Sequence, residues 1–247
     1  MKLQLARLAL VVVLPTAAWA QDYDEPRNAT VNAAGATTLK IDARAGQLRV
    51  TGRTDITEVR VRGTARASSR GLLADIKLEA VRNGNEVTVR AILPDYHDTN
   101  WNTQALLDLV IEAPATLPLD INDSSGDMTI ESVAAKTRIE DSSGNIRVRD
   151  AGGDLWIDDS SGGIDIRGVK GSVDIDEDSS GEIEIYDVTG SVRVGRDSSG
   201  SIDVSRVGGD FVVEHDGSGS IDYDGVKGKV DIPRKDRYHR SSYRSNR

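Results

Sequence analysis

DSSGEIEIYDVTGSVRVGRDSSG, residues 178–200, begins and ends with the same tetrapeptide, which recurs through the second half of the chain. The spacing between successive copies is 18 residues for the first two steps and 19 for the last three. Six copies at a nearly fixed period indicate a repeat architecture. Five copies read Asp-Ser-Ser-Gly and the last reads Asp-Gly-Ser-Gly; they start at Asp123, Asp141, Asp159, Asp178, Asp197 and Asp216.

Each copy contains a shorter unit in which a glycine is followed by apolar residues two and four positions later. Gly181-Glu-Ile-Glu-Ile185 is followed by Gly190-Ser-Val-Arg-Val194, for example. Such alternation is typical of a strand with one buried face, and strands this short need stacked neighbours to bury it. We therefore predict an all-β fold: a parallel, β-helix-like β-solenoid with 18–19 residues and two short strands per coil, each coil rising by about 4.8 Å. Right-handed crossover is the default for parallel strands.

A third apolar column supports this prediction and helps to exclude a rival fold. Left-handed hexapeptide helices use coils of similar length, but they place an apolar residue every six positions, and this chain does not. The column lies near the middle of each coil, where it can fill the corner opposite Asp-Ser-Ser-Gly; its members are Val133, Ala151, Val169, Val188, Val207 and Val226.

The remaining sequence divides into regions of different character. Residues 1–20 combine two basic residues, an apolar run and Ala18-Trp19-Ala20, which is the pattern of a secretory signal peptide. We predict a polar linker over 21–34, an irregular β capping half over 35–121, regular solenoid repeats over 122–232 and a basic disordered tail over 233–247. In the capping half, Asn83-Gly84 predicts a hairpin turn.

Composition restricts the class of protein further. The chain has 247 residues, a net charge of −9 and no cysteine, which excludes disulfides, thiolate metal sites and a lipid-modified cysteine. The apolar run near the start is too short for a membrane span. We therefore expect an exported protein that does not span the membrane and is found in the periplasm, outside the cell or on its surface.

Three stretches resemble a known bacterial family of exported β-strand repeat proteins, the "putative adhesin" domain family DUF4097. They are LKIDARAGQLRVTG at 39–52, LDLVIEAPATLPLDI at 107–121, and repeats such as SSGGIDIRGVKGSVDI at 160–175. The resemblance covers roughly residues 35–232 and implies a solenoid with an adhesive role. It brings no catalytic motif to any residue of this chain.

Two interpretations of the repeated tetrapeptide remain open. The column from Asp123 to Asp216 could form a carboxylate ladder that binds Ca²⁺, with Asp158 and Glu177 beside it in two copies. Alternatively, Asp and Ser bond to nearby backbone groups and Gly takes the positive φ of a tight corner, which each coil needs whether or not anything binds. The calcium-binding nonapeptide G-G-x-G-x-D is absent, which favours the corner.

Catalysis is not expected, and neither is a cofactor. The only histidines, His97, His215 and His239, lie in three different regions, and we interpret them as surface residues. No serine lies in the strand-to-helix context of a G-x-S-x-G nucleophile, because no helix is expected. A polysaccharide-cleaving enzyme would need clustered acids, whereas the repeat distributes them evenly.

Candidate partner-binding residues fall in three places. In the loop DYHDTNWNT at 95–103, Tyr96, His97 and Trp101 could stack on sugars, although a plain polar loop explains the sequence as simply. Trp156 faces outward between neighbours Arg138 and Asp174, where it could anchor a partner or cover the sheet. The tail could bind anionic lipid or polysaccharide, or only add solubility, through Arg234, Lys235, Arg237, Arg240, Arg244 and Arg247.

The sequence thus predicts a non-enzymatic, adhesin-like solenoid that binds an envelope or extracellular partner. We expect this partner to be a cell-envelope component or another protein. Nucleic acid is not expected after export. The alternative is a self-assembling envelope scaffold or signalling protein, because terminal coils expose sheet edges.

Overall fold

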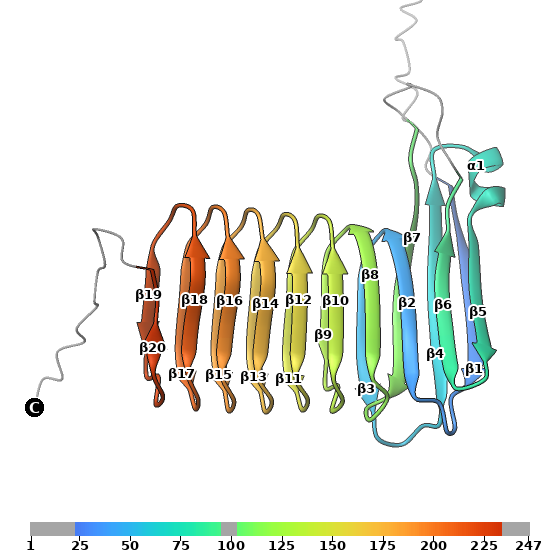
Figure 1. Cartoon of the computed structure of the whole chain (residues 1–247). Helices are drawn as coiled ribbons and strands as arrows, with labels where there is room; N and C mark the ends of the chain where they lie inside the picture. Colours follow the sequence, from blue (N-terminus) through green and yellow to red (C-terminus); the bar gives the residue numbers. More distant parts are fainter. Residues whose placement is uncertain (1–22, 95–102, 234–247) are drawn as a thin grey trace, which may run out of the picture.

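The structure is a computed structural model and describes residues 23–94 and 103–233. Two ten-stranded sheets face each other, with the core between them (Figure 1). In order, one sheet contains β1 (Tyr23–Asn32), β4 (Glu58–Ala67), β7 (Ala105–Pro114), β3 (Leu48–Arg53), β9 (Met128–Glu131), β11 (Ile146–Ala151), β13 (Ile164–Val169), β15 (Ile183–Val188), β17 (Ile202–Val207) and β19 (Ile221–Asp224). The other contains β20 (Val230–Asp231), β18 (Phe211–Asp216), β16 (Val192–Asp197), β14 (Val173–Asp178), β12 (Leu155–Asp159), β10 (Thr137–Asp141), β8 (Leu119–Ser125), β2 (Thr38–Ala45), β6 (Glu86–Ile92) and β5 (Lys77–Asn83).

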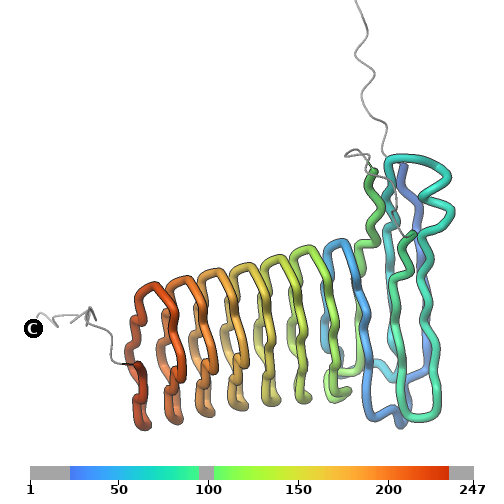
Figure 2. The backbone as a smooth tube through the Cα atoms, turned by 45° about the horizontal axis from the view of Figure 1, so that its top comes forward, coloured from blue at the N-terminus to red at the C-terminus, as the bar shows by residue number. Residues whose placement is uncertain are grey.

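From β8 onward the chain alternates between the two sheets, and each coil adds one parallel strand to both. The register follows the repeat: Ile183 pairs with Ile164 on one side and with Ile202 on the other. Figure 2 shows these coils as a regular stack. The predicted all-β, parallel solenoid is therefore confirmed.

The apolar residues of the alternating pattern form the core. Ile183, Ile185, Val192 and Val194 of successive strands are 0% exposed. The third column is also buried, at 4% exposure or less from Val133 to Val207. This confirms for five of its six members that the column fills the corner opposite the Asp-Ser-Ser-Gly tetrapeptides, whereas Val226 in the last coil is half-buried.

The N-terminal half closes one end of the solenoid by mixing strand directions. The β2–β3 coil stacks in parallel on β8 and β9, and on its other side β2 pairs with β6 and β3 with β7. Antiparallel strands then continue both sheets, because β4 pairs with β7 and β5 pairs with β6. The predicted hairpin at Asn83-Gly84 joins β5 to β6 and is confirmed.

The polar linker predicted over 21–34 is wrong, since β1 occupies Tyr23–Asn32 and pairs antiparallel with β4 over ten residues. Tyr23, Ala29 and Val31 pack against the core, while most of the residues between them face solvent. Pro26 is tolerated because β1 is an edge strand.

A short helix, α1 (Arg70–Asp75), also departs from the expectation that the chain has no helix. The Ser69 hydroxyl accepts a hydrogen bond from the backbone N–H of Leu72 and caps the helix start. Arg27 of β1 donates to the carbonyl oxygens of Leu73 and Ile76 near the helix end. The helix is thereby held against the terminal strands. In the part of the chain that the structure describes, no helix has the length and apolarity to cross a membrane.

Candidate functional site

Each Asp-Ser-Ser-Gly tetrapeptide turns the chain from one sheet to the other, and all four of its residues have a structural role there. At Asp159, Oδ1 accepts a hydrogen bond from the backbone N–H of Ser161 at 3.1 Å. The Ser161 hydroxyl donates to the carbonyl oxygen of Ser142 in the preceding coil, also at 3.1 Å. The same bonds recur in other coils, so the tetrapeptide forms a corner that is fastened to its neighbours.

The glycine of each corner is required by both its conformation and the close approach of the next coil. Gly181 has a φ of +147°, and a Cβ added to it would lie 1.7 Å from the carbonyl oxygen of Gly162. The column of corner glycines begins one coil earlier than the sequence repeat indicated, at Gly46, whose tetrapeptide reads Ala-Arg-Ala-Gly. The tetrapeptide edge therefore extends over seven coils.

The six aspartates of this edge are buried and aligned. They are at most 5% exposed, and the strand register pairs each one with the next. Burial, aided by the neighbouring carboxylates, raises the pKa of Asp123 and Asp159 to about 7, and burial raises that of Asp141 and Asp178 to about 6. Within residues 23–94 and 103–233, no group of three or more acidic or histidine side chains is arranged to hold a metal.

The opposite edge is open and is lined by different residues in each coil. It is formed by the third apolar column together with the residues on either side of it. The preceding residue has left-handed backbone in six successive coils, at Ser132, Asp150, Gly168, Asp187, Arg206 and Gly225. The following residue donates its N–H to the preceding coil, as Thr189 does to the carbonyl oxygen of Val169 at 2.8 Å. The backbone there is satisfied between coils, so the side chains are left free for other contacts.

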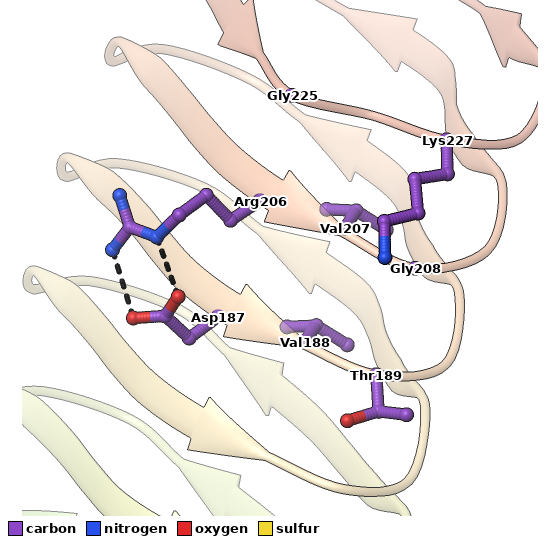
Figure 3. Close-up of a pocket in the computed structure, with 8 residues that line it drawn as sticks. All are labelled: Asp187, Val188, Thr189, Arg206, Val207, Gly208, Gly225 and Lys227. Carbon is purple, nitrogen blue, oxygen red and sulfur yellow. Dashed lines mark hydrogen bonds and ion pairs between the residues drawn. The ribbon is translucent and has the colours of Figure 1, made fainter.

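Two hollows on this edge together form what we call the axial groove. One, of about 550 Å³, contains Asp187, Thr189 and Lys227 in its lining and is shown in Figure 3. The other, of about 460 Å³, reaches from Thr54 and Ala115 to Asp187 and Thr189. Because the hollows share two residues and follow the stacked columns, the groove crosses six coil steps and is about 29 Å long.

Charge is unevenly distributed along the axial groove. Arg206 bonds to both carboxylate oxygens of Asp187, and this guanidinium lowers the pKa of the Asp187 carboxyl (Figure 3). Lys170 and Lys227 lie on the other wall and are exposed. The groove therefore combines ammonium groups, a hydroxyl at Thr189 and short side chains.

Trp156 lies on the outer face of β12, as the alternation predicted, with Arg138 and Asp174 beside it in the neighbouring strands. The Arg138 guanidinium lies 3.5 Å from the centre of the Trp156 ring, and Arg138 also bonds to Glu140. Trp156 is half-buried under this cover. The arrangement matches the interpretation that it covers the sheet, and its role as an anchor stays a prediction.

Several predicted residues lie outside the described part of the chain. These include the signal peptide over 1–20, Tyr96, His97 and Trp101 of the loop, and the tail residues Arg234, Lys235, Arg237, Arg240, Arg244 and Arg247. His215 is described and exposed, as predicted. Trp156, the one predicted partner-binding residue within the described ranges, does not line the axial groove, whose variable positions the sequence analysis passed over.

Comparisons with known proteins reveal only distant likenesses. No protein-family model matches the chain, so its resemblance to DUF4097 stays a prediction, and no curated protein matches it. Solved structures do match. A "putative adhesin" from Parabacteroides distasonis ATCC 8503 has a TM-score of 0.45 and 15% identity over 85% of this chain and 97% of its own.

Two further solved structures cover the same region. A "putative lipid binding protein" from the same organism gives 0.40 and 15%, over 84% of this chain and 94% of its own. A "putative cell adhesion protein" from Clostridium sporogenes ATCC 15579 gives 0.35 and 12%, over 86% and 99%. Likenesses this distant do not determine what this chain binds.

Proposed function

We propose that this protein is a non-enzymatic, exported binding protein of adhesin type, which holds an extended polymer of the cell envelope or its surroundings along the axial groove. The observation that carries the proposal is the run of variable, outward residues along one edge, built on a backbone already bonded between coils. Extended repeat surfaces suit such recognition without chemistry. A linear chain can contact one coil after another at intervals of about 4.8 Å.

The chemistry of the groove supports binding rather than catalysis. Two carboxylates line the hollows: Asp187 is held by Arg206 and so is not free to act as a general base, and Asp150 is exposed and lies two coils away, about 10 Å. Lys170 and Lys227 lie three coils apart, about 14 Å, and can each take an acidic or hydroxyl group of the polymer. Short residues between them, such as Gly208 beside Thr189, leave room for the chain itself.

The basic tail is proposed as a second attachment point. It contains six Arg or Lys against one Asp, and it would bind anionic lipid or polysaccharide through charge. We expect a form ending at Ile232 to pellet with isolated envelopes less than residues 21–247 at low salt, and the difference to vanish at high salt. Equal pelleting of the two forms at low salt would exclude the tail from binding.

Groove substitutions test the main proposal directly. Ala134→Arg with Thr189→Arg places two bulky side chains in the axial groove, and we expect envelope binding to fall at least about tenfold, roughly the loss of one interface hot spot. The matched control, Ser142→Arg with Ser198→Arg, adds the same charge to exposed positions on the tetrapeptide edge. Equal binding by both double variants, with both folded by circular dichroism, would contradict a groove site.

One observation favours the alternative, a self-assembling scaffold. Among the described strands, β19 and β20 are each paired on one side only, and Tyr223 of β19 is 45% exposed. A second copy that docks on these open edges would continue both sheets. We expect assembly to appear as a sedimentation coefficient that rises with concentration and is lowered by Tyr223→Lys. A concentration-independent monomer would exclude this alternative.

A further inference from the structure

The buried aspartates of the tetrapeptide edge have a property that a corner alone does not require. In Asp123, Asp141, Asp159 and Asp178, one carboxylate oxygen accepts a backbone N–H. The second oxygen of these four is buried and has no hydrogen-bond partner within the described residues. An unpaired buried oxygen of this kind is costly, and four in one column need a physical explanation.

Among the described residues, no cationic group lowers the pKa of these four aspartates, and Arg44, which the register places opposite Asp123, is exposed and pairs with Asp42. The charged groups that act on these aspartates are the other aspartates of the column and, at its N-terminal end, Asp42. The residue directly before each aspartate points to the outer face, because side chains alternate along a strand. The titratable residues at these positions are half-buried or exposed; they are Glu140, Asp158, Glu177, Arg196 and His215. The strand that follows each corner starts with a buried apolar residue, namely Met128, Ile146, Ile164, Ile183, Ile202 or Ile221.

Full ionisation of such a column is unfavourable. Successive aspartates occupy paired positions on neighbouring strands, so their charges would lie about 5 Å apart in a region that solvent does not reach. A proton on the second oxygen removes one charge, and an uncharged carboxyl group costs much less to bury than a carboxylate does. One added proton thus relieves both problems.

We propose that the aspartate column is a proton-binding ladder, in which the buried carboxyl groups of successive coils take up protons in mild acid and so fasten the tetrapeptide edge. The ligand is the proton, and the ladder consists of Asp123, Asp141, Asp159 and Asp178. The ladder is separate from the axial groove, which lies on the other edge, and it stands or falls independently of the proposed function.

The ladder makes stability depend on pH in a defined direction. The pKa values of about 6 to 7 in the folded chain lie above the ordinary value of 3.8, so between these limits the folded state binds more protons than the unfolded state. The stabilisation is complete below about pH 4 and is lost as the pH rises through 6 and 7. The protein should therefore be more stable in mild acid than in mild base.

Thermal unfolding of the full chain between pH 4.5 and 8.5 tests the proposal, at high salt so that surface repulsion is screened. We expect Tm to fall by about 10 °C or more across this range. Asp141→Asn with Asp159→Asn and Asp178→Asn imitates the protonated state, so it should flatten the profile and raise Tm at pH 8. The control removes three outward charges, with Asp120→Asn, Asp176→Asn and Asp222→Asn, and should keep the wild-type slope.

Infrared spectroscopy gives a readout that does not depend on the variants. A carboxylic-acid carbonyl band in the folded wild-type protein at pH 6, absent from the unfolded chain and from the triple Asn ladder variant, would support the ladder. A spectrum with carboxylate bands only, together with a flat Tm profile, would overturn it. Equal slopes in the ladder and control variants would also overturn it, because surface charge would then explain the pH dependence. If the ladder variant does not fold, the wild-type spectrum decides.

Discussion

The two edges of the solenoid are turned by the same chain at the same period, yet they are built in opposite ways. The tetrapeptide edge repeats its sequence, buries its aspartates and bonds its serines from coil to coil. The opposite edge, which we call the valine edge, repeats only the third apolar column from Val133 to Val226. The residues on either side of that column vary from coil to coil. The first edge therefore specifies the stack, whereas the second is free to carry recognition.

The largest expected effect on stability comes from a glycine-to-alanine substitution on the tetrapeptide edge, compared with the same substitution on the valine edge. Gly181→Ala places a Cβ 1.7 Å from the carbonyl oxygen of Gly162, so the backbone must move, and we expect a loss of about 3–5 kcal/mol in the free energy of unfolding. Gly168→Ala is the matched change on the valine edge, where the nearest atom to a Cβ would be Oδ1 of Asp150 at 3.0 Å and backbone atoms would lie at 3.6 Å or more.

Gly168→Ala should cost about 1 kcal/mol, because other residues of its column already adopt a positive φ. Urea unfolding of both variants measures the difference. Equal losses would remove the contrast between the edges.

An intermediate effect on stability is expected for substitutions in the third apolar column, which is part of the core. Val207 is 0% exposed in the third apolar column, and Val207→Ala should cost about 2 kcal/mol through lost burial and the cavity that remains. Ala151 occupies the same column, where other coils have valine, so Ala151→Val should cost about 1 kcal/mol, the lower end for an enlarged core side chain. A loss at Ala151 as large as that at Val207 would show that the column is not equivalent from coil to coil.

The smallest expected effect on stability concerns Asp187, which lines both hollows of the axial groove. Asp187→Gly removes an exposed ion pair with Arg206 but relieves a φ of +62°, so the unfolding free energy should stay close to that of the wild type. Asp187→Ala loses the pair without that relief and should be the less stable of the two variants. Thermal unfolding at low salt compares them. A large loss in both would make Asp187 a structural residue rather than a groove residue.

The repeat half was predictable from the sequence because the tetrapeptide and its alternating apolar pattern recur six times. Gly181 and Gly190 mark successive strand starts, and the alternation after each one sets which face is buried. Register then follows from stacking like on like, as the pairing of Ile183 with Ile202 shows. Local pattern and long-range contact agree here, so short-range reasoning was sufficient.

The N-terminal half was less predictable because its contacts are not local. Nothing in the alternation around Leu39 or Leu48 indicates that the β2–β3 coil lies between β8–β9 on one side and β6 and β7 on the other. The strand β1 was missed because Pro26 and its charged neighbours are unusual in a strand, and because its partner strand begins far along the chain at Glu58. The Ala-Arg-Ala-Gly corner ending at Gly46 was a missed signal, since only its glycine matches the later copies.

The candidate sites show the same limit. Sequence reasoning assigned Asp159 and its equivalents either to a corner or to a carboxylate ladder that binds Ca²⁺, and the hydrogen bond to Ser161 matches the corner. Their burial was not anticipated, because aspartate is rarely buried without a charged partner. The axial groove was missed since Thr189 and Arg206 lie at positions where the repeat is irregular, and irregular positions carry no period to detect.

The direction of the hydrogen bonds between coils has a mechanical consequence. These bonds run along the solenoid axis, so tension applied between the two ends loads them in series, and the coils open one after another rather than together. Release would begin at the β19–β20 end, because β19 and β20 pair with their neighbours over four and two residues, whereas the edge strands β1 and β5 at the other end pair over ten and seven. Each coil set free lengthens the chain by 18 or 19 residues, about 60 Å, so a tethered molecule would lengthen stepwise under tension instead of detaching at once.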